Sequence, residues 1–209
     1  LVNNDGRYEM DFEDAASRLT GNEKMVVLCS PHNPGGRVWT PEELRGLADF
    51  CVEHDLILVS DEIHHDLVFS GHKHTVMPLA APDISDRLVM LTAPTKTFNI
   101  AGCHNGNVIV DDAKLRAEFS ATMMGLGLSP NAFGLHMETA AYSPEGAEWL
   151  EALMQYLAVN QSIFDAGIEA IPGLKSMPME ATYLSWVDFS GTGMPVEEFR
   201  RRIEKVAKI

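Results

Sequence analysis

Two short apolar runs, each followed by turn-forming residues, flank a segment with the pattern of an amphipathic helix. The runs are MVVLCS, residues 25–30, and LILVS, residues 56–60. Between them, TPEELRGLADFCVEHD offers Thr40 as the N-cap, Pro41 at the first helical position and Glu43 three residues after the cap. This arrangement is a capping box. A strand, a covering helix and a second strand at this spacing predict a right-handed parallel crossover unit.

The rest of the chain extends this α/β pattern. Apolar residues 44, 47, 48 and 51 recur at helical spacing, which predicts a helix lying on a sheet. Both flanking runs are apolar throughout and predict fully buried strands. Two further runs, residues 88–92 and 107–110, predict a third and a fourth strand. We therefore expect an α/β fold, a mostly parallel sheet covered by helices.

A change of pattern near Pro172 predicts a domain boundary. Residues from 111 to about 171 have helical periodicity, including a long amphipathic stretch. Beyond them, we expect short strands and then a helix from residue 196. Residues 1–171 would form a large domain, and residues 172–209 the start of a smaller α+β C-terminal domain. Because the chain begins without methionine and stops within a helical pattern, we expect it to be part of a longer protein.

Composition narrows the class of partner. The chain has 209 residues, 45% of them hydrophobic, with 16 Lys+Arg against 30 Asp+Glu and a net charge of −14. This balance gives no basic footprint for nucleic acid or an anionic membrane, so a small-molecule substrate is expected. No run approaches the ~20 apolar residues that span a bilayer.

Cysteine usage favours the cytoplasm. The cysteines, Cys29, Cys51 and Cys103, are odd in number and far apart, and no CxxC spacing joins them. Such a pattern suits neither a disulfide framework nor a zinc site. We expect all three to be buried free thiols.

Polar side chains follow three of the predicted strands. Asn33 lies in SPHNPGG after the first, Asp61 and His64 lie in SDEIHHD after the second, and Lys96 lies in APTK after the third. Ligands of open parallel sheets bind beyond the carboxyl ends of the strands. An amide, a carboxylate, an imidazole and an amine are therefore expected to share one cleft.

Each of these residues also has a purely structural interpretation. Asn33 could belong to a tight turn, and Asp61 could cap the next helix. His64 could be an interior histidine, and Lys96 could extend its stem to solvent. His65, His72 and His74 are interpreted as loop residues. The spacing of these histidines and Asp66 fits no known ligand pattern, so no metal site is expected.

Asn33, Asp61, His64 and Lys96 together are a more specific signal than any one of them. A lysine in apolar surroundings loses its charge readily and can become a nucleophile. A nucleophilic lysine, an aspartate for a pyridinium N–H and neutral donors for a phenolic oxygen are what pyridoxal 5'-phosphate requires. The motifs SPHNPGGRVWTPEEL, ILVSDEIHHDLVF and TKTFNIAG together resemble fold type I pyridoxal-phosphate enzymes of the aminotransferase class I/II superfamily. Within it they are most similar to the cystathionine beta-lyase branch, of the MalY/PatB type.

The resemblance implies a role for each matching residue. Lys96 would attach the cofactor covalently, and Asp61 would pair with its ring nitrogen. Asn33 would hydrogen-bond the 3-oxygen of the cofactor, and His64 stands where many aminotransferases have a tyrosine for the same oxygen. Thr95 would reach the phosphate.

The chain departs from the family pattern at two positions. Ala93 stands where a serine is common, which removes one phosphate hydroxyl, and His104 stands where many aminotransferases have a phosphate-binding arginine. The family's glycine-containing phosphate loop and ring-stacking aromatic residue are expected before residue 1. Its substrate-carboxylate arginine is expected after Ile209. The resemblance also implies a homodimer.

Three functions are consistent with this pattern. The DEIH sequence and the context of Lys96 favour a carbon–sulfur beta-lyase acting on a small amino-acid substrate, cystathionine or a related cysteine thioether. The alternative is an aminotransferase on the same scaffold, because a fold does not fix a reaction. The third is a non-catalytic regulatory protein that binds pyridoxal phosphate.

Overall fold

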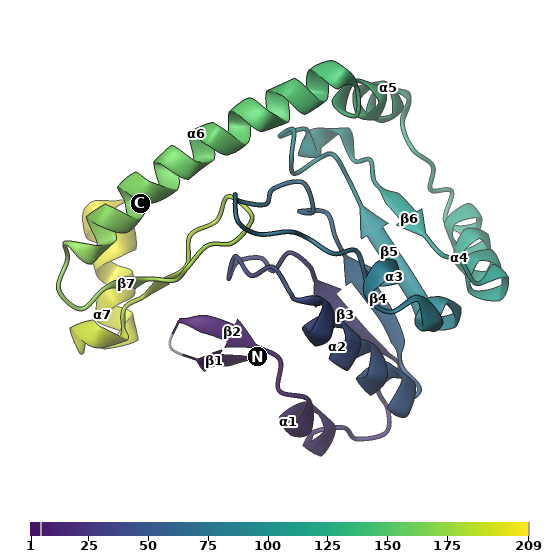
Figure 1. The fold of residues 1–209 in the computed structure, drawn as a ribbon, viewed down its shortest axis with the longest axis horizontal. Helices are drawn as coiled ribbons and strands as arrows, with labels where there is room; N and C mark the ends of the chain where they lie inside the picture. Colours follow the sequence, from purple (N-terminus) through teal and green to yellow (C-terminus); the bar gives the residue numbers. More distant parts are fainter. Residues whose placement is uncertain (5, 209) are drawn as a thin grey trace.

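A four-stranded sheet forms the centre of the computed structural model, which describes residues 1–4 and 6–208. The strands in sheet order are β3 (Met25–Cys29), β4 (Ile57–Asp61), β5 (Leu88–Thr92) and β6 (Asn107–Ile109). The pairs β3–β4 and β4–β5 are parallel, whereas β6 runs antiparallel to β5 (Figure 1). The predicted α/β architecture and all four predicted strands are therefore present.

Helix α2 (Pro41–Glu53) is the predicted crossover between β3 and β4. The Thr40 hydroxyl accepts a hydrogen bond from the Glu43 N–H at 3.2 Å, and the Glu43 carboxylate accepts one from the Thr40 N–H at 2.8 Å. These reciprocal bonds confirm the capping box. The buried face of α2 packs on β4 and on the short helices α3 (Met77–Ala80) and η1 (Pro82–Arg87).

The prediction that β3 is fully buried is wrong. Met25 is 54% exposed and Val27 is 66% exposed, whereas Leu28 is buried. The reason is that β3 is an edge strand and α2 covers only one face of the sheet, so alternate side chains point away from the core. In β4, likewise, Leu58 and Ser60 are fully buried and their neighbours are only half-buried.

The cysteines are free thiols, as predicted, but only Cys51 is buried. Cys29 and Cys103 are half-buried, which corrects the expectation for these two. Cys29 ends an edge strand, and Cys103 lies in the short helix η2 (Ala101–Cys103), which contributes no residue to the core.

Helices dominate after β6, as expected. They are α4 (Ala113–Gly125), α5 (Ala132–Ala141) and α6 (Pro144–Glu169). Figure 1 shows α6 running from α5 towards the C-terminal elements, which follow it in the chain. These elements are β7 (Lys175–Ser176), β8 (Val187–Asp188), η3 (Ser190–Thr192), α7 (Val196–Arg201) and η4 (Arg202–Ala207). The domain boundary near Pro172 stays a prediction.

The N-terminal residues form a small hairpin and a short helix beside the sheet (Figure 1). These elements are β1 (Val2–Asn4), β2 (Arg7–Glu9) and α1 (Phe12–Ser17). Within the described part of the chain, each helix is too short or too polar to cross a membrane.

Candidate active site

The carboxyl ends of the three parallel strands lie level with one another. Cys29, the last residue of β3, pairs in register with Asp61, the last residue of β4, and Asp61 pairs with Leu91 of β5. The loops after these strands therefore start from the same edge of the sheet. They carry Asn33, His64 and Lys96, so the four predicted groups share this edge as expected.

Asn33 and His64 face one another across two of these loops. The side-chain nitrogen Nδ2 of Asn33 lies 3.4 Å from Nε2 of His64. Asn33 is exposed, and its backbone N–H donates to Sγ of Cys29 at 3.3 Å, which ties its loop to the end of β3. The amide is therefore held beside the imidazole while part of it stays open to solvent.

His64 is buried but not fully hydrogen-bonded. Its side chain is 2% exposed, and Nδ1 has no hydrogen-bond partner. Burial lowers the pKa of His64, the positive charge of Lys96 lowers it further, and the negative charge of Asp61 acts in the opposite direction. The lowered pKa favours the neutral imidazole, in which one nitrogen carries a proton and the other accepts.

Asp61 is a half-buried carboxylate at the end of β4. Its Oδ1 accepts a hydrogen bond from the N–H of Ile63 at 3.3 Å, so a local capping role is present. Its charge also acts on the neighbouring Cys29, whose pKa is raised by burial first and by Asp61 as a weaker contribution. Asp61 therefore has a structural role, and its negative charge also acts on neighbouring groups at the ends of the strands.

Lys96 lies in a tight turn after β5. The turn is closed by hydrogen bonds from the N–H of Phe98 to the Pro94 carbonyl and from the N–H of Ile100 to the Thr95 carbonyl, each at 3.0 Å. Thr95 is buried and Lys96 is half-buried, so the lysine is not simply a surface side chain. Lys96 lies near enough to His64 for its positive charge to lower the pKa of that histidine.

Thr97, next to the lysine, fixes this turn to the loop after β4. Its side chain is buried, and its hydroxyl donates a 2.9 Å hydrogen bond to Oδ2 of Asp66. Asp66 follows His64 closely in the chain. The bond therefore sets the position of the lysine turn relative to the histidine loop.

Glu62 is an important residue that the sequence analysis did not single out. Its buried carboxylate accepts hydrogen bonds from the Ser60 hydroxyl at 3.0 Å and the Met77 N–H at 2.9 Å, and lies 2.7 Å from Nε2 of His74. Glu62 thus points to the helix-covered face, on the same side as Ser60, and anchors the segment that returns to the core. An acidic pair directly after an apolar strand was the signal available in the sequence.

His65, His72 and His74 lie in loops, as predicted, and two of them contact different atoms of Glu62. His74 pairs with Glu62, and Nδ1 of His65 lies 2.7 Å from the Glu62 carbonyl oxygen. Among residues 1–4 and 6–208, no three histidine, cysteine or acidic side chains gather closely enough to bind a metal ion.

Tyr183 of the C-terminal segment also reaches the site. Its ring makes an edge-on contact with His64, with ring centroids 5.7 Å apart and an interplanar angle of 70°. The contact joins residues that are remote in the chain, and no spacing rule connects them. The sequence analysis missed Tyr183 for this reason.

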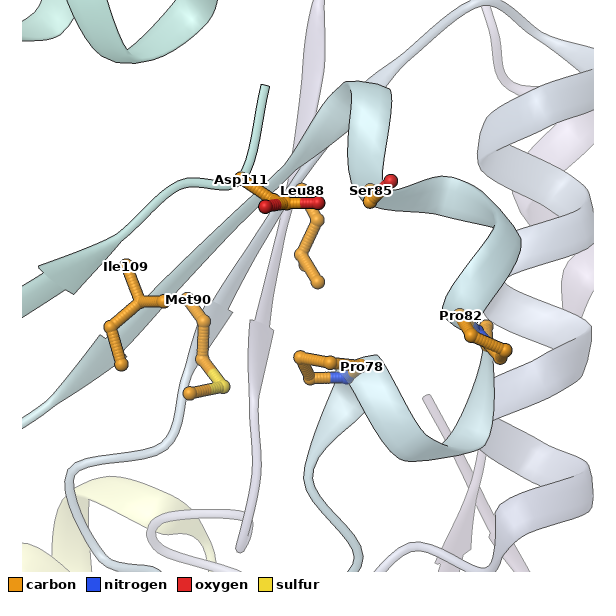
Figure 2. Close-up of a pocket in the computed structure, with 8 residues that line it drawn as sticks. Pro78, Pro82, Ser85, Leu88, Met90, Ile109 and Asp111 are labelled. Carbon is orange, nitrogen blue, oxygen red and sulfur yellow. The ribbon is translucent and has the colours of Figure 1, made fainter. Parts of the chain in front are cut away.

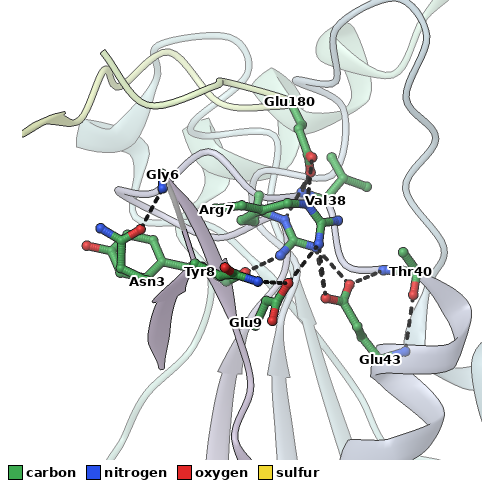
Figure 3. A network of polar contacts seen from close by, with 11 residues as sticks. Asn3, Gly6, Arg7, Tyr8, Glu9, Val38, Thr40, Glu43 and Glu180 are labelled. Carbon is green, nitrogen blue, oxygen red and sulfur yellow. Dashed lines mark hydrogen bonds and ion pairs between the residues drawn. The ribbon is translucent and has the colours of Figure 1, made fainter. Parts of the chain in front are cut away.

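A buried arginine, Arg37, links the Asn33 loop to the N-terminal hairpin and to the C-terminal segment; its partners Tyr8, Glu43 and Glu180 are labelled in Figure 3. Arg37 is 1% exposed and forms ion pairs with Glu43 at 2.7 Å and with Glu180 at 3.2 Å. It also donates to the carbonyl oxygen of Tyr8 and lies over the ring of Trp39. The network therefore connects the hairpin, the start of α2 and the segment that precedes Tyr183.

A separate cavity of about 250 Å³ lies away from these groups (Figure 2). Its lining is mostly apolar and comes from α3, η1 and the residue between them, from β5, and from the end of β6 and the segment that follows it: Pro78, Ala81, Pro82, Ser85, Leu88, Met90, Ile109 and Asp111. Leu88 begins β5, so the cavity lies towards the strand end opposite Lys96. It brings none of the predicted site residues together.

Comparison with known proteins identifies the family. The sequence pattern of the family described as "Aminotransferase class I and II" matches residues 2–206. The chain belongs to this family. The resemblance that the three motifs predicted is therefore confirmed.

Two curated members of the family are similar to this chain. Cystathionine beta-lyase PatB of Bacillus subtilis (strain 168) is 41% identical over 212 residues, which cover 100% of this chain and 54% of PatB. Protein MalY of Escherichia coli (strain K12) is 38% identical over 168 residues, 79% of this chain and 42% of MalY. The chain spans about half the length of these relatives.

Cystalysin from Treponema denticola, whose crystal structure contains a pyridoxal 5'-phosphate cofactor, has the same fold. It superimposes with a TM-score of 0.91 at 34% identity, over 100% of this chain and 53% of cystalysin. The predicted α/β fold, the large-domain fold of pyridoxal-phosphate-dependent transferases, is confirmed.

Proposed function

We propose that the full-length protein is a pyridoxal-phosphate-dependent carbon–sulfur beta-lyase acting on cystathionine or a related cysteine thioether. The observation that carries this proposal is the meeting of four groups, an amide, a carboxylate, an imidazole and an amine, at one edge of the sheet. The similarity to PatB over the whole chain selects the lyase among the reactions of the family. The substrate is thus a small amino acid.

The residues present fit pyridoxal 5'-phosphate. Asp61 can accept the ring N–H, the amide of Asn33 can donate to the 3-oxygen, and His64 can donate to the same oxygen in the tautomer that carries its proton on Nε2. The amine of Lys96 is available for covalent attachment, and the hydroxyl of Thr95 can contribute to phosphate binding. When bound, the cofactor withdraws electrons from the alpha carbon of the substrate.

Each residue then has a defined task in the elimination. Asp61 would pair with the proton of the ring nitrogen, while His64 and Asn33 would orient the ring through its oxygen. The freed amine of Lys96 takes the proton from the alpha carbon of the substrate. As the carbon–sulfur bond breaks, Lys96 can return a proton to the leaving thiolate. Cystathionine and one water molecule would yield homocysteine, pyruvate and ammonia.

Two other functions remain as alternatives. Transamination would use the same four groups, with a proton delivered to the cofactor instead of loss of a thiolate, and the family includes aminotransferases. A non-catalytic regulatory protein would bind the cofactor without turnover. The DEIH motif at residues 61–64 and the similarity to PatB favour the lyase.

We propose further that the protein is a cytoplasmic homodimer, with a large domain ending near residue 171 and a smaller domain beginning at residue 172. Free thiols support the reducing compartment. The net charge of −14 favours a small-molecule substrate over nucleic acid or an anionic membrane. Light scattering of the full-length protein would test the dimer.

The test of the function uses full-length protein and cystathionine without a keto acid. A lyase should release pyruvate and free thiol at equal rates, and the protein should be yellow. An aminotransferase would release neither product but would convert an added keto acid to its amino acid. Colour without either activity would favour the regulatory protein.

A further inference from the structure

We propose that Tyr183 is a positioning residue for His64: its ring holds the imidazole beside Asn33 and shields it from water. The packing of the two rings does not depend on the proposed function. Only the role of His64 as a donor to the cofactor rests on it. The contact itself is the edge-on packing of the two rings, 5.7 Å between centroids. Tyr183 is 43% exposed, so its ring is not part of the hydrophobic core.

Backbone hydrogen bonds fix the residues before Tyr183 to both site loops. The N–H groups of Glu180 and Ala181 donate to the carbonyl oxygen of Gly36, at 2.8 and 3.0 Å. The N–H of Thr182 donates to the carbonyl oxygen of Leu67 at 2.7 Å. Gly36 belongs to the loop of Asn33, and Leu67 belongs to the loop of His64. The position of Tyr183 is therefore tied to both.

Gly36 shows how closely the C-terminal segment approaches the Asn33 loop. It has a φ of +67°, and a Cβ atom on it would lie 2.9 Å from Cγ of Met179. Only glycine fits such a backbone and such a contact without strain. The close approach indicates that the segment has one well-defined position on this loop.

Thr182 directs the chain into the contact. Its φ is +73°, in the left-handed region that a β-branched residue rarely adopts, and its side chain is fully buried. Its hydroxyl accepts a hydrogen bond from the N–H of Leu184 at 3.3 Å, so Tyr183 lies between two fixed neighbours. A backbone of this kind persists where the surroundings determine it, and often at functional sites.

The contact of Tyr183 matters chemically because it affects the protonation of the His64 ring. Nδ1 is buried without a partner, so a proton there would be an unsatisfied buried N–H. Nε2, by contrast, faces the amide nitrogen Nδ2 of Asn33, which can only donate, so Nε2 accepts in this contact and the proton is left on Nδ1. Water admitted at Nδ1 would satisfy that N–H and would also stabilise the doubly protonated, charged ring.

Several groups face His64 from the elements packed around it. Asp61 from β4 and Lys96 from the turn after β5 are charged, Asn33 from the loop after β3 is neutral, and Tyr183 comes from the C-terminal segment. Burial lowers the pKa of His64 and is the largest cause of the shift. Removing the Tyr183 ring reduces that burial and leaves both charged groups in place.

The test follows His64 directly in full-length protein. NMR of protein labelled with carbon-13 in its histidine rings gives a pH titration, and the missing signal of His64→Gln assigns the resonance. In Tyr183→Ala, we expect the His64 midpoint to rise by about half a pH unit or more, towards the ~6.5 of an exposed histidine. Tyr183→Phe should titrate like the wild type, because it keeps the ring. Tyr156→Ala, a tyrosine exposed on α6, is the matched control.

An unchanged midpoint in Tyr183→Ala would overturn the proposal, and so would a Tyr183→Phe midpoint equal to that of Tyr183→Ala. The second result would mean that the hydroxyl acts and not the ring. If Tyr183→Ala does not fold, Tyr183→Gln, which also lacks the ring, replaces it with the same expected rise. The titration needs no substrate, so it stands or fails separately from the cystathionine assay.

Discussion

Arg37 donates a 3.2 Å hydrogen bond through Nε to Oε2 of Glu180, a residue 143 positions later in the chain. The same carboxylate oxygen accepts a 2.7 Å hydrogen bond from the N–H of Val38 (Figure 3). The C-terminal segment is therefore fastened to the loop that carries Asn33 by a nearly buried ion pair. Nη2 of the same guanidinium binds Glu43, at the start of α2.

Glu180→Gln tests this fastening. The change removes one charge from a buried ion pair, and a hydrogen bond to a charged group contributes about 1.5–3 kcal/mol. We expect the free energy of unfolding to fall by about that amount in urea titrations. Hydrogen exchange at the backbone N–H groups of residues 180–182 should accelerate, because these groups bond to the two site loops.

Glu43→Gln is the matched control for this change. The substitution also removes one carboxylate that pairs with Arg37, but Glu43 belongs to the capping box of α2. Its hydrogen exchange should accelerate at the first turn of α2 and stay slow at residues 180–182. Equal acceleration of residues 180–182 in both variants would contradict a specific role for Glu180.

Lys96→Ala should abolish covalent attachment of the cofactor in full-length protein while the fold persists. Lys96 is the lysine whose charge reaches His64 at the strand ends. Borohydride reduction followed by peptide mapping should find the pyridoxyl group on Lys96 in the wild type. Lys114→Ala, an exposed change on α4, should keep the attachment. A pyridoxyl group on Lys73 or Lys114 would refute the assignment.

Asp61→Ala should bind the cofactor but lose most turnover. Without a carboxylate the ring nitrogen loses its partner, and a charge-assisted hydrogen bond of roughly 1.5–3 kcal/mol corresponds to a rate loss of about ten- to a hundredfold. Steady-state rates of pyruvate release give the comparison. Asp83→Ala, which removes an exposed carboxylate paired with Arg45, is the control. Activity within a few-fold of the wild type would mean that Asp61 has only a local structural role, the hydrogen bond with the N–H of Ile63.

Thr97→Val should loosen the lysine turn from the histidine loop. The hydroxyl of Thr97 is buried, and its loss leaves Oδ2 of Asp66 without that donor. We expect a loss of about 1–3 kcal/mol in the free energy of unfolding. Thr122→Val is the control, because its hydroxyl bonds to a helix carbonyl at an exposed position. Equal losses in the two variants would argue against a special role for the buried bond.

Cys51 gives a prediction about pH. Burial raises the pKa of its thiol to about 11, and the positive charge of Arg87 only partly offsets this. An unfolded thiol ionises near pH ~8.5, so between about pH 8.5 and 11 the unfolded chain releases a proton that the folded chain keeps. Stability due to Cys51 is present below this range and is lost as the pH rises through it.

The measurement is the urea midpoint at both ends of that range. Cys51→Ala should show a shallower fall of the midpoint than the wild type. Cys103→Ala changes a half-buried thiol and should keep the slope of the wild type. Parallel slopes in the wild type and Cys51→Ala would show that other groups cause the fall.

Local signals in the sequence predicted the strands and the position of the site. The boundaries predicted for β5 from its apolar run agree with the structure at both ends. Those predicted for β3 and β4 differ from the structure by at most one residue at each end. Turn residues and the Thr40 capping box placed the loops and α2. The carboxyl ends of parallel strands lie at one edge of a sheet. The order of strands and polar residues along the chain was therefore enough to predict that Asn33, Asp61 and Lys96 lie near one another.

Long-range contacts could not be predicted in this way. The contact of Tyr183 with His64 and the pair of Arg37 with Glu180 depend on how a distant segment returns to the sheet. The exposure of Val27 was missed because an apolar run shows that a strand can be buried on both faces, not that both faces are covered. These features are set by tertiary packing.

The two neighbouring acids at the end of β4 have opposite surroundings, since Glu62 is buried with Ser60 while Asp61 lies at the strand edge with His64. Side chains of a strand alternate, so a shift of one residue exchanges the two faces. A single-residue deletion between Ile57 and Ser60 would put Glu62 on the side of His64 and Asp61 in the core. A change in the length of this strand therefore exchanges the surroundings of the two acids, whereas a substitution along it leaves them in place.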